Sequence, residues 1–243
     1  MSAPDPNGGD LTSTLGALAT PELVPSQRRR LLSHLTSQLP PARAWRRPAT
    51  AVHWAADSVG ELAPHVPVRS LATLHEHHSG LAGDQLADRL VRNAARSTAG
   101  VGAASGGLAA VKWTVPPTLL TAPVLLCVET VAVVAIEIKL IGELYETYRV
   151  PVPGTRSQQA VTLLQAWARQ RGVNPLLPGA GVTVALGTAA RKELVERLAR
   201  RYVRNLPTLA PLLAGAAVAA ILNRRGTRAL GRQVRADLAR LTG

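Results

Sequence analysis

The sequence predicts an all-α protein, a compact helical bundle of Gly/Ala-rich apolar helices and basic amphipathic helices. Hydrophobic residues make up 47% of the 243 residues, and most of them are Ala, Leu and Val, a mixture that favours helices. Aromatic residues make up only 3%, Phe is absent, and strand-like alternation is scarce. The length suffices for one sizeable domain or two small ones.

Changes in composition divide the chain into three parts. Pro and Gly punctuate residues 1–25, which we expect to form a flexible N-terminal tail. Residues 26–82 mix helical patterns with prolines and are expected to form an N-terminal helical segment. Residues 83–243, where Gly and Ala become frequent, are expected to form a hydrophobic helical domain.

Short helices are expected within the N-terminal segment. Ser26 is the predicted N-cap of a first helix, and Pro40 ends it. A second helix is predicted over 48–63. Ser70 is the predicted cap of a third, short helix that Gly80 terminates.

Small residues recur at four-residue spacing in three segments of the hydrophobic domain. On a helix this spacing gathers them on one face, where they allow a second helix to approach closely in a membrane or in a crowded core. The predicted helix-packing residues are Ala99, Gly102, Ala103, Gly106, Gly107, Gly179, Gly187, Gly215 and Ala219.

The apolar run over 115–136 contains a single charge, Glu129. A run of about 20 apolar residues can span a bilayer. Ten Leu, Ile or Val residues between Thr118 and Ile136 each favour insertion by about 0.3–0.6 kcal/mol, whereas a central acid opposes it by roughly 2.5–3.5 kcal/mol. A transmembrane helix and the central helix of a compact bundle both remain open.

A second run, over 206–222, carries no charge. Its 17 residues are only just enough to span, and they include Pro207 and Pro211. Arg204 lies on one side and Arg224 on the other, an arrangement that suits a shallow hairpin or an interfacial element as well as a full span.

Amphipathic helices are predicted between and after these runs, over 155–171, 191–204 and 227–241. The last two carry strongly basic faces. The apolar face predicted for the last helix consists of Leu230, Val234, Leu238 and Leu241.

Carboxylates inside apolar helices need a partner, a proton or contact with water. Glu129 and Glu137 are the predicted buried polar residues. Each is interpreted either as a polar anchor between helices or as part of an ion or lipid pathway.

The net charge of +13 is concentrated at the two ends of the chain, and 191–243 alone carries a net +9. Basic ends around an apolar middle favour an anionic membrane surface or bilayer as partner. A protein partner or self-association is the alternative. Nucleic acid fits less well, because an aromatic platform and a helix-turn-helix signature are lacking. The predicted membrane-surface residues are Arg200, Arg201, Arg204, Arg224, Arg225 and Arg228.

Catalytic, cofactor-binding and metal-binding motifs are missing from the sequence, so we expect no enzyme and no cofactor. The histidines over 75–78 lack the spacing of a zinc site and indicate a solvated helix end. His53, Asp57 and Glu61 share a helix face that could hold a metal or a proton relay, although such coincidences are common.

The N-terminal residues lack a basic segment followed by an apolar one, so no cleavable signal peptide is expected. The single cysteine, Cys127, lies in the apolar run and is expected to behave as a small hydrophobe. The predicted location is the cytoplasmic membrane, with integral or peripheral attachment.

Two motifs in the second half of the chain resemble the bacterial EcsC-like family. The first is the Ile-x-x-x-Tyr signature over 141–145, followed by Tyr148; Arg149 then stands where the family often has Gly. The second is a Pro-marked helix with small residues that ends in Asn, Thr and Gly. Its residues in this chain are Pro211, Gly215, Ala219, Asn223, Thr227 and Gly231.

The resemblance covers roughly 84–241 and implies an all-α hydrophobic module without established enzymatic activity. It also implies a link to envelope or transport processes. We therefore expect a non-enzymatic, membrane-associated helical accessory protein. The alternative is a soluble helical scaffold that docks a partner or a second copy of itself.

Overall fold

The computed structural model describes residues 14, 17, 23–37, 58–60, 62–112, 122–170 and 212–242. These residues form helices and contain no strand, which confirms the all-α prediction. The elements are α2 (Pro25–Ser37), the 3₁₀ helix η2 (Ala63–His65), α4 (Leu71–His77), α5 (Gly83–Lys112), α6 (Ala122–Thr147), α7 (Arg156–Gln170) and α10 (Leu212–Thr242).

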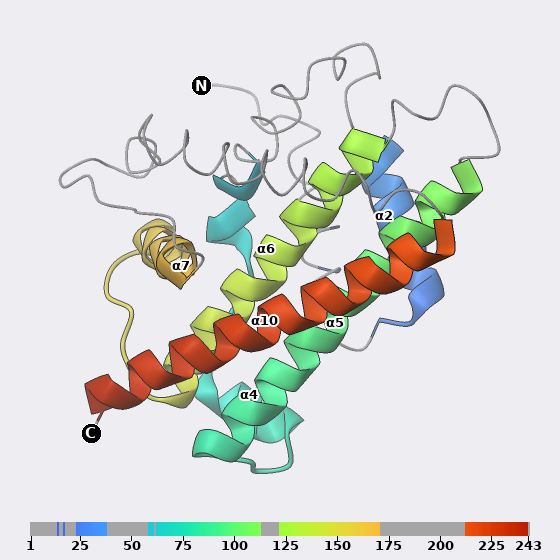
Figure 1. The fold of residues 1–243 in the computed structure, drawn as a ribbon. Helices are drawn as coiled ribbons and strands as arrows, with labels where there is room; N and C mark the ends of the chain where they lie inside the picture. Colours follow the sequence, from blue (N-terminus) through green and yellow to red (C-terminus); the bar gives the residue numbers. More distant parts are fainter. Residues whose placement is uncertain are drawn as a thin grey trace, which may run out of the picture.

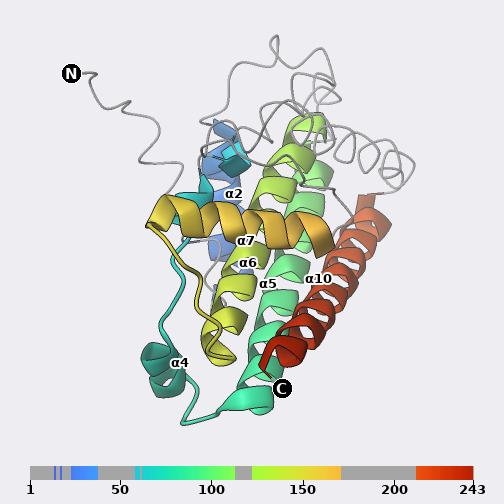
Figure 2. The same ribbon diagram turned by 90° about the vertical axis from the view of Figure 1, so that its left-hand side faces the viewer.

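The helices α5 and α6 run side by side in opposite directions, and α10 crosses both of them (Figure 1). Turning the molecule shows α7 lying across α6, close to perpendicular to it (Figure 2). Helix α2 packs against α5 and α6, and α4 contacts α6. The helix α6 is therefore contacted by every other described α-helix.

The core is built around α6, where every residue from Val128 to Leu144 except Lys139 is buried. Leu86 and Leu90 of α5 and Leu230 and Leu238 of α10 join it, and each is at most 2% exposed. A buried leucine contributes about 1.5–3 kcal/mol relative to an exposed one. A helix that is apolar on all sides is typical of the centre of a bundle, so the sequence of α6 matches its position.

The backbones of helices α5 and α10 are in close contact at Gly102. A Cβ added at this position would lie 2.8 Å from the carbonyl carbon of Ala219 and 2.9 Å from the backbone nitrogen of Ala220. Farther along the same contact, a Cβ at Gly231 would lie 2.6 Å from Cγ2 of Val91. Glycine is thus required where the two backbones meet.

The structure confirms one predicted helix start and corrects another. The hydroxyl of Ser70 accepts a hydrogen bond from the backbone N–H of Thr73 at 3.4 Å, which confirms Ser70 as the N-cap of α4. Helix α2, in contrast, begins at Pro25, and Ser26 lies inside it. Proline suits the first helical position because its fixed φ matches the helix and it has no N–H to leave unpaired.

Helix α6 ends in a left-handed turn at Arg149, whose φ is 56°. The N–H of the next residue, Val150, donates to the carbonyl oxygen of Tyr145 at 2.9 Å. Glycine is favoured in this conformation because it has no Cβ. The departure from the EcsC-like pattern at Arg149 therefore falls on a residue with glycine-like backbone geometry.

Helix α10 is longer than expected. The charge-free run over 206–222 and the amphipathic helix over 227–241 were predicted as separate elements, but 212–242 form one continuous helix. No proline occurs within it, and Gly226 alone costs too little to break a helix packed along its length. Leu230, Val234 and Leu238 are buried as predicted, whereas Leu241 is 70% exposed.

The expectation of a transmembrane helix is wrong for the residues that the structure describes. None of their helices combines the length and the apolar character that crossing a bilayer requires. Helix α6, described from Ala122 onward, carries Glu129, Glu137, Lys139 and Glu143, and these charges interrupt its apolar character. Residues 115–121 and 206–211 lie outside the described part.

Candidate functional site

A chain of buried polar side chains links α5, α6 and α10. Glu129, 7% exposed, accepts a 2.7 Å hydrogen bond on Oε1 from Nδ2 of Asn223. The same amide nitrogen lies 3.3 Å from the carbonyl oxygen of Thr98. One amide of α10 thus bonds both neighbouring helices, beside the close approach at Gly102.

One turn farther along α10, the hydroxyl of Thr227 lies 2.9 Å from the hydroxyl of Thr98. Thr227 also donates to Oε1 of Glu137 at 2.9 Å, and Nε1 of Trp167 donates to Oε2 at 2.8 Å. Glu137 is only 1% exposed. Its carboxylate therefore joins α6, α7 and α10 inside the core.

A third carboxylate of α6, Glu143, is 3% exposed and is held by a bidentate ion pair. Nε and Nη2 of Arg69 donate to its two oxygens at 2.7 and 3.1 Å. Nζ of Lys139 lies 3.6 Å from Oε1 of Glu143 and donates to the carbonyl oxygen of Pro67 at 2.9 Å. These contacts fasten the segment before α4 to the core.

A fourth cluster joins the end of α6 to α5 and α10. The hydroxyl of Tyr148 donates to Asp84 at 2.6 Å, and Arg235 bonds Tyr148, Asp84 and Asp88. Burial and the bond to Asp84 raise the pKa of Tyr148. Hydrogen bonds from Tyr148 and Arg235 lower the pKa of Asp84. Burial by itself would lower the pKa of Arg235, but its bonds to Tyr148 and Asp84 outweigh that effect and raise it.

These four clusters join helices to one another. In the described ranges no group of His, Cys, Asp and Glu is placed to hold a metal ion. His77 uses Nδ1 in a 2.8 Å hydrogen bond with the carbonyl oxygen of Thr73, within its own helix. His53, Asp57 and Glu61 lie outside the described residues.

The outward face of α10 is apolar in its first part and basic in its second part. Val218, Ile221 and Leu222 are 37%, 49% and 49% exposed, although they belong to the charge-free run. Directly after them, Arg224 and Arg225 are exposed and Arg228 is half-buried. We call these six residues the α10 outer face.

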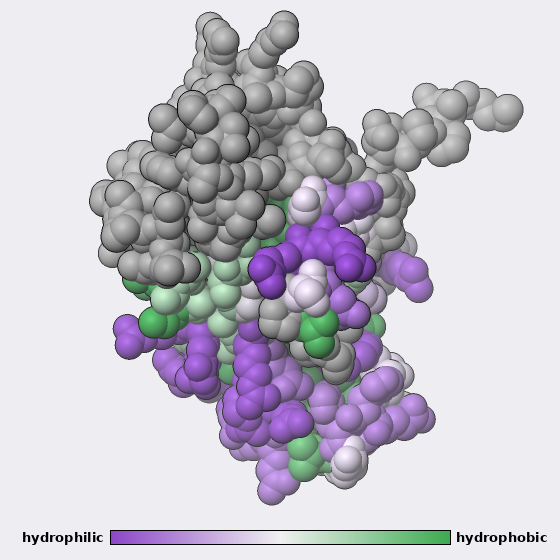
Figure 3. Space-filling view, turned by 90° about the vertical axis from the view of Figure 1, so that its right-hand side faces the viewer, coloured by the Kyte–Doolittle hydropathy of each residue, from purple (hydrophilic) through white to green (hydrophobic). Residues whose placement is uncertain are grey.

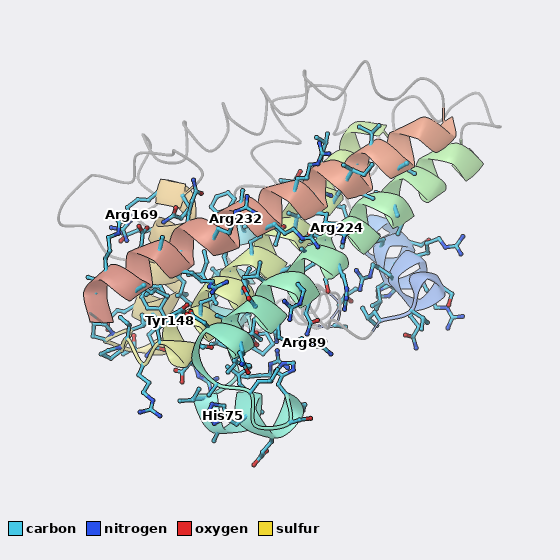
Figure 4. The ribbon with its side chains drawn as sticks, turned by 60° about the horizontal axis from the view of Figure 1, so that its bottom comes forward. His75, Arg89, Tyr148, Arg169, Arg224 and Arg232 are labelled. Atoms are coloured by element: carbon cyan, nitrogen blue, oxygen red, sulfur yellow. The ribbon has the colours of Figure 1, made fainter. Side chains whose placement is uncertain are left out.

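The apolar part of this surface adjoins strongly hydrophilic residues at the left of the molecule in Figure 3. Arg224 and Arg232 mark the cationic part of α10 in Figure 4. Helical spacing explains the alignment: Ile221, Arg225 and Arg232 are separated by four and seven residues and so lie on one side. The surface offers apolar contact area and positive charge to the same partner.

The predicted helix-packing residues behave differently from one another. Gly102 lies in the contact with Ala219, and Ala99 is half-buried. Ala103 is exposed, which corrects its prediction as a packing residue: it lies one position after Gly102 and is therefore turned away from α10 by about 100°. Gly106 and Gly107 belong to α5, and Gly215 belongs to α10.

Several predicted residues cannot be placed. Gly179, Gly187, Arg200, Arg201 and Arg204 lie outside the described residues, as does the helix predicted over 191–204.

Sequence reasoning missed three features. Arg28 is buried at 3% exposure and donates to the carbonyl oxygen of Ser97, although arginines are seldom fully buried. Trp167 is buried in the core, and its indole N–H bonds Glu137. The third missed feature is that Ile221 and Leu222 are exposed. The change from apolar to basic residues at Arg224 was the signal in the sequence that could have predicted this exposure.

Comparisons with family models, with curated proteins and with solved structures found no match to this chain.

Proposed function

We propose that this protein is a non-enzymatic helical module that docks on an anionic membrane surface through the α10 outer face. The observation that carries the proposal is that exposed Ile221 and Leu222 share one side of α10 with exposed Arg225, one turn farther along the helix. Interfacial helices bind in this manner, with apolar residues at the acyl boundary and basic residues among the headgroups.

The free energies expected for contact between the α10 outer face and a membrane favour reversible binding. Burying three half-exposed apolar side chains contributes about 1 kcal/mol each, since full burial is worth about 1.5–3 kcal/mol. Each arginine near an anionic surface adds about 1 kcal/mol. The total, on the order of 6 kcal/mol, corresponds to weak, salt-sensitive attachment.

Sedimentation with vesicles tests the proposal. The full chain should pellet with vesicles that contain anionic phospholipid and should be released in about 1 M salt, where the Debye length is about 3 Å. The double change Arg224→Glu and Arg225→Glu should abolish pelleting. The control, Arg156→Glu with Arg169→Glu on α7, changes the net charge equally and should bind like the parent.

The same apolar strip also supports the alternative, a scaffold that pairs with a second copy. Light scattering during size exclusion separates the two proposals. A dimer that Leu222→Glu converts to a monomer, together with no pelleting with anionic vesicles, would favour the scaffold over the membrane module.

A further inference from the structure

The crossing of α5 and α10 places a solvent-facing side of one helix next to a solvent-facing side of the other. Arg235 of α10 bonds Asp88 of α5, and both side chains are partly exposed. Arg92 follows Asp88 by one turn of α5, and Arg228 precedes Arg235 by two turns of α10. Arg92 and Arg228 therefore extend this shared side of the helix pair.

More exposed residues continue along the shared side. Arg96 lies one turn after Arg92 on α5, and both are exposed. On α10, exposed Arg232 lies one turn after the half-buried Arg228, and Ile221, 49% exposed, lies two turns before it. We call these five residues, Arg92, Arg96, Ile221, Arg228 and Arg232, the α5–α10 basic surface.

The carboxylates of α5 and α10 do not neutralise this surface. The two helices contain three of them, Asp84, Asp88 and Asp237. Asp84 and Asp88 pair with Arg235, and Asp237 pairs with Arg240. In the part of the chain that the structure describes, the four arginines of the α5–α10 basic surface form no ion pair. Their positive charge is therefore available to a partner.

We propose that the α5–α10 basic surface binds anionic phospholipid headgroups, so that α5 lies on the membrane together with α10. This inference rests on the proposed membrane function and extends the contact from the α10 outer face, with which it shares Ile221 and Arg228, to a second helix. Ile221 suits the acyl boundary of a bilayer, whereas surfaces for single-stranded nucleic acid combine basic residues with aromatic rings. Each arginine near an anionic surface strengthens binding about fivefold, so Arg92 and Arg96 together contribute about 30-fold.

Sedimentation with vesicles of equal parts phosphatidylglycerol and phosphatidylcholine tests the contribution of α5. Arg92→Gln with Arg96→Gln should weaken binding of the full chain by about 30-fold. The matched control, Arg156→Gln with Arg169→Gln at two exposed positions of α7, should stay within about threefold of the parent, since only charges near the membrane contribute.

The outcomes separate this inference from the proposed function. If the α5 variant binds like the α7 control while Arg224→Glu with Arg225→Glu loses binding, α10 docks alone, and the α5–α10 basic surface is overturned while membrane docking stands. A parent that fails to pellet would overturn both. If the α5 variant pellets like the control but loses binding to fluorescein-labelled oligothymidylate that the parent shows in anisotropy, the surface belongs to nucleic acid.

A fluorophore on α5 provides a second test. Ala103 is exposed and lies two turns after Arg96, on the same side of α5. In a Cys127→Ser background, Ala103→Cys labelled with an environment-sensitive fluorophore should show a blue shift on addition of these vesicles, and Arg169→Cys on α7 should not. An unchanged spectrum at residue 103 while the labelled protein pellets would contradict contact between α5 and the membrane.

Discussion

Nε1 of Trp167 donates a 2.8 Å hydrogen bond to Oε2 of Glu137 and so ties α7 to the central helix α6. The second oxygen of the same carboxylate accepts from Thr227 of α10. Glu137 is among the most buried of the described residues, at 1% exposure. A carboxylate in such a position must be surrounded by donors, and these donors come from two different helices.

Replacing Trp167 by Phe should destabilise the protein by about 1–3 kcal/mol, because the carboxylate loses a donor in a place that water does not reach. Urea unfolding followed by circular dichroism measures the change. Lost packing also contributes, so the matched test is a double-mutant cycle with Glu137→Gln, which isolates the pairwise coupling. Additive effects in that cycle would show that the bond contributes nothing beyond packing.

Gly102→Ala should cost about 1–3 kcal/mol, because the added methyl group meets the backbone of Ala219 and Ala220, which cannot move without shifting α10. The control is Ala103→Ser at the next, exposed position of α5, which should change stability by about 0.5 kcal/mol or less. Equal unfolding midpoints for the two variants would argue against close packing of α5 on α10.

Much of the fold could be predicted from the sequence, because it rests on local signals. Ser70 predicted the start of α4 correctly, and the apolar run over 115–136 predicted a central helix, which α6 forms. The fusion of two predicted elements into α10 could not be foreseen, since tertiary packing along 212–242 overrides the weak preferences around Gly226.

Arg149→Gly should stabilise the protein by about 0.5–1 kcal/mol, because the residue has a φ of 56°, a conformation that glycine adopts without strain. The gain should appear as a higher midpoint in urea. Arg156→Gly, at the first residue of helix α7, is the control and should lower stability instead. A loss of stability in Arg149→Gly would mean that the arginine side chain outweighs the backbone strain.

His78 should make stability depend on pH below neutrality. Burial, then the charges of Arg69 and Arg89, lowers its pKa from the ordinary value of 6.5. The folded state therefore binds this proton less readily than the unfolded state, and the stability that the neutral imidazole contributes is lost as pH falls below 6.5.

Thermal unfolding at pH 7 and at about pH 5 measures this effect, since the unfolded histidine with its pKa near 6.5 titrates between them. His78→Asn should flatten the dependence. The matched change His77→Asn, at an exposed histidine whose charge is the last of the causes that shift the pKa of His78, should alter the dependence far less. If His78→Asn showed the full acid sensitivity of the parent, another group would be responsible.

The candidate site was less accessible to sequence reasoning than the fold. The exposed arginines at 224 and 225 followed from charge clustering, but burial or exposure of Ile221 and Leu222 depends on which face of α10 packs against α5. Asn223 and Thr227 take the inward face and turn these apolar residues outward. Only the packed helix reveals the combination of apolar and basic groups on one side.

The most direct measurement is the environment of residue 222 on a membrane. In a Cys127→Ser background, Leu222→Cys and, as control, Arg169→Cys on α7 are each labelled with an environment-sensitive fluorophore. Membrane docking through α10 predicts a blue shift and increased emission at residue 222 on addition of anionic vesicles, with no change at 169 and reversal by salt. Unchanged emission at residue 222 while the protein pellets with those vesicles would contradict docking through the α10 outer face.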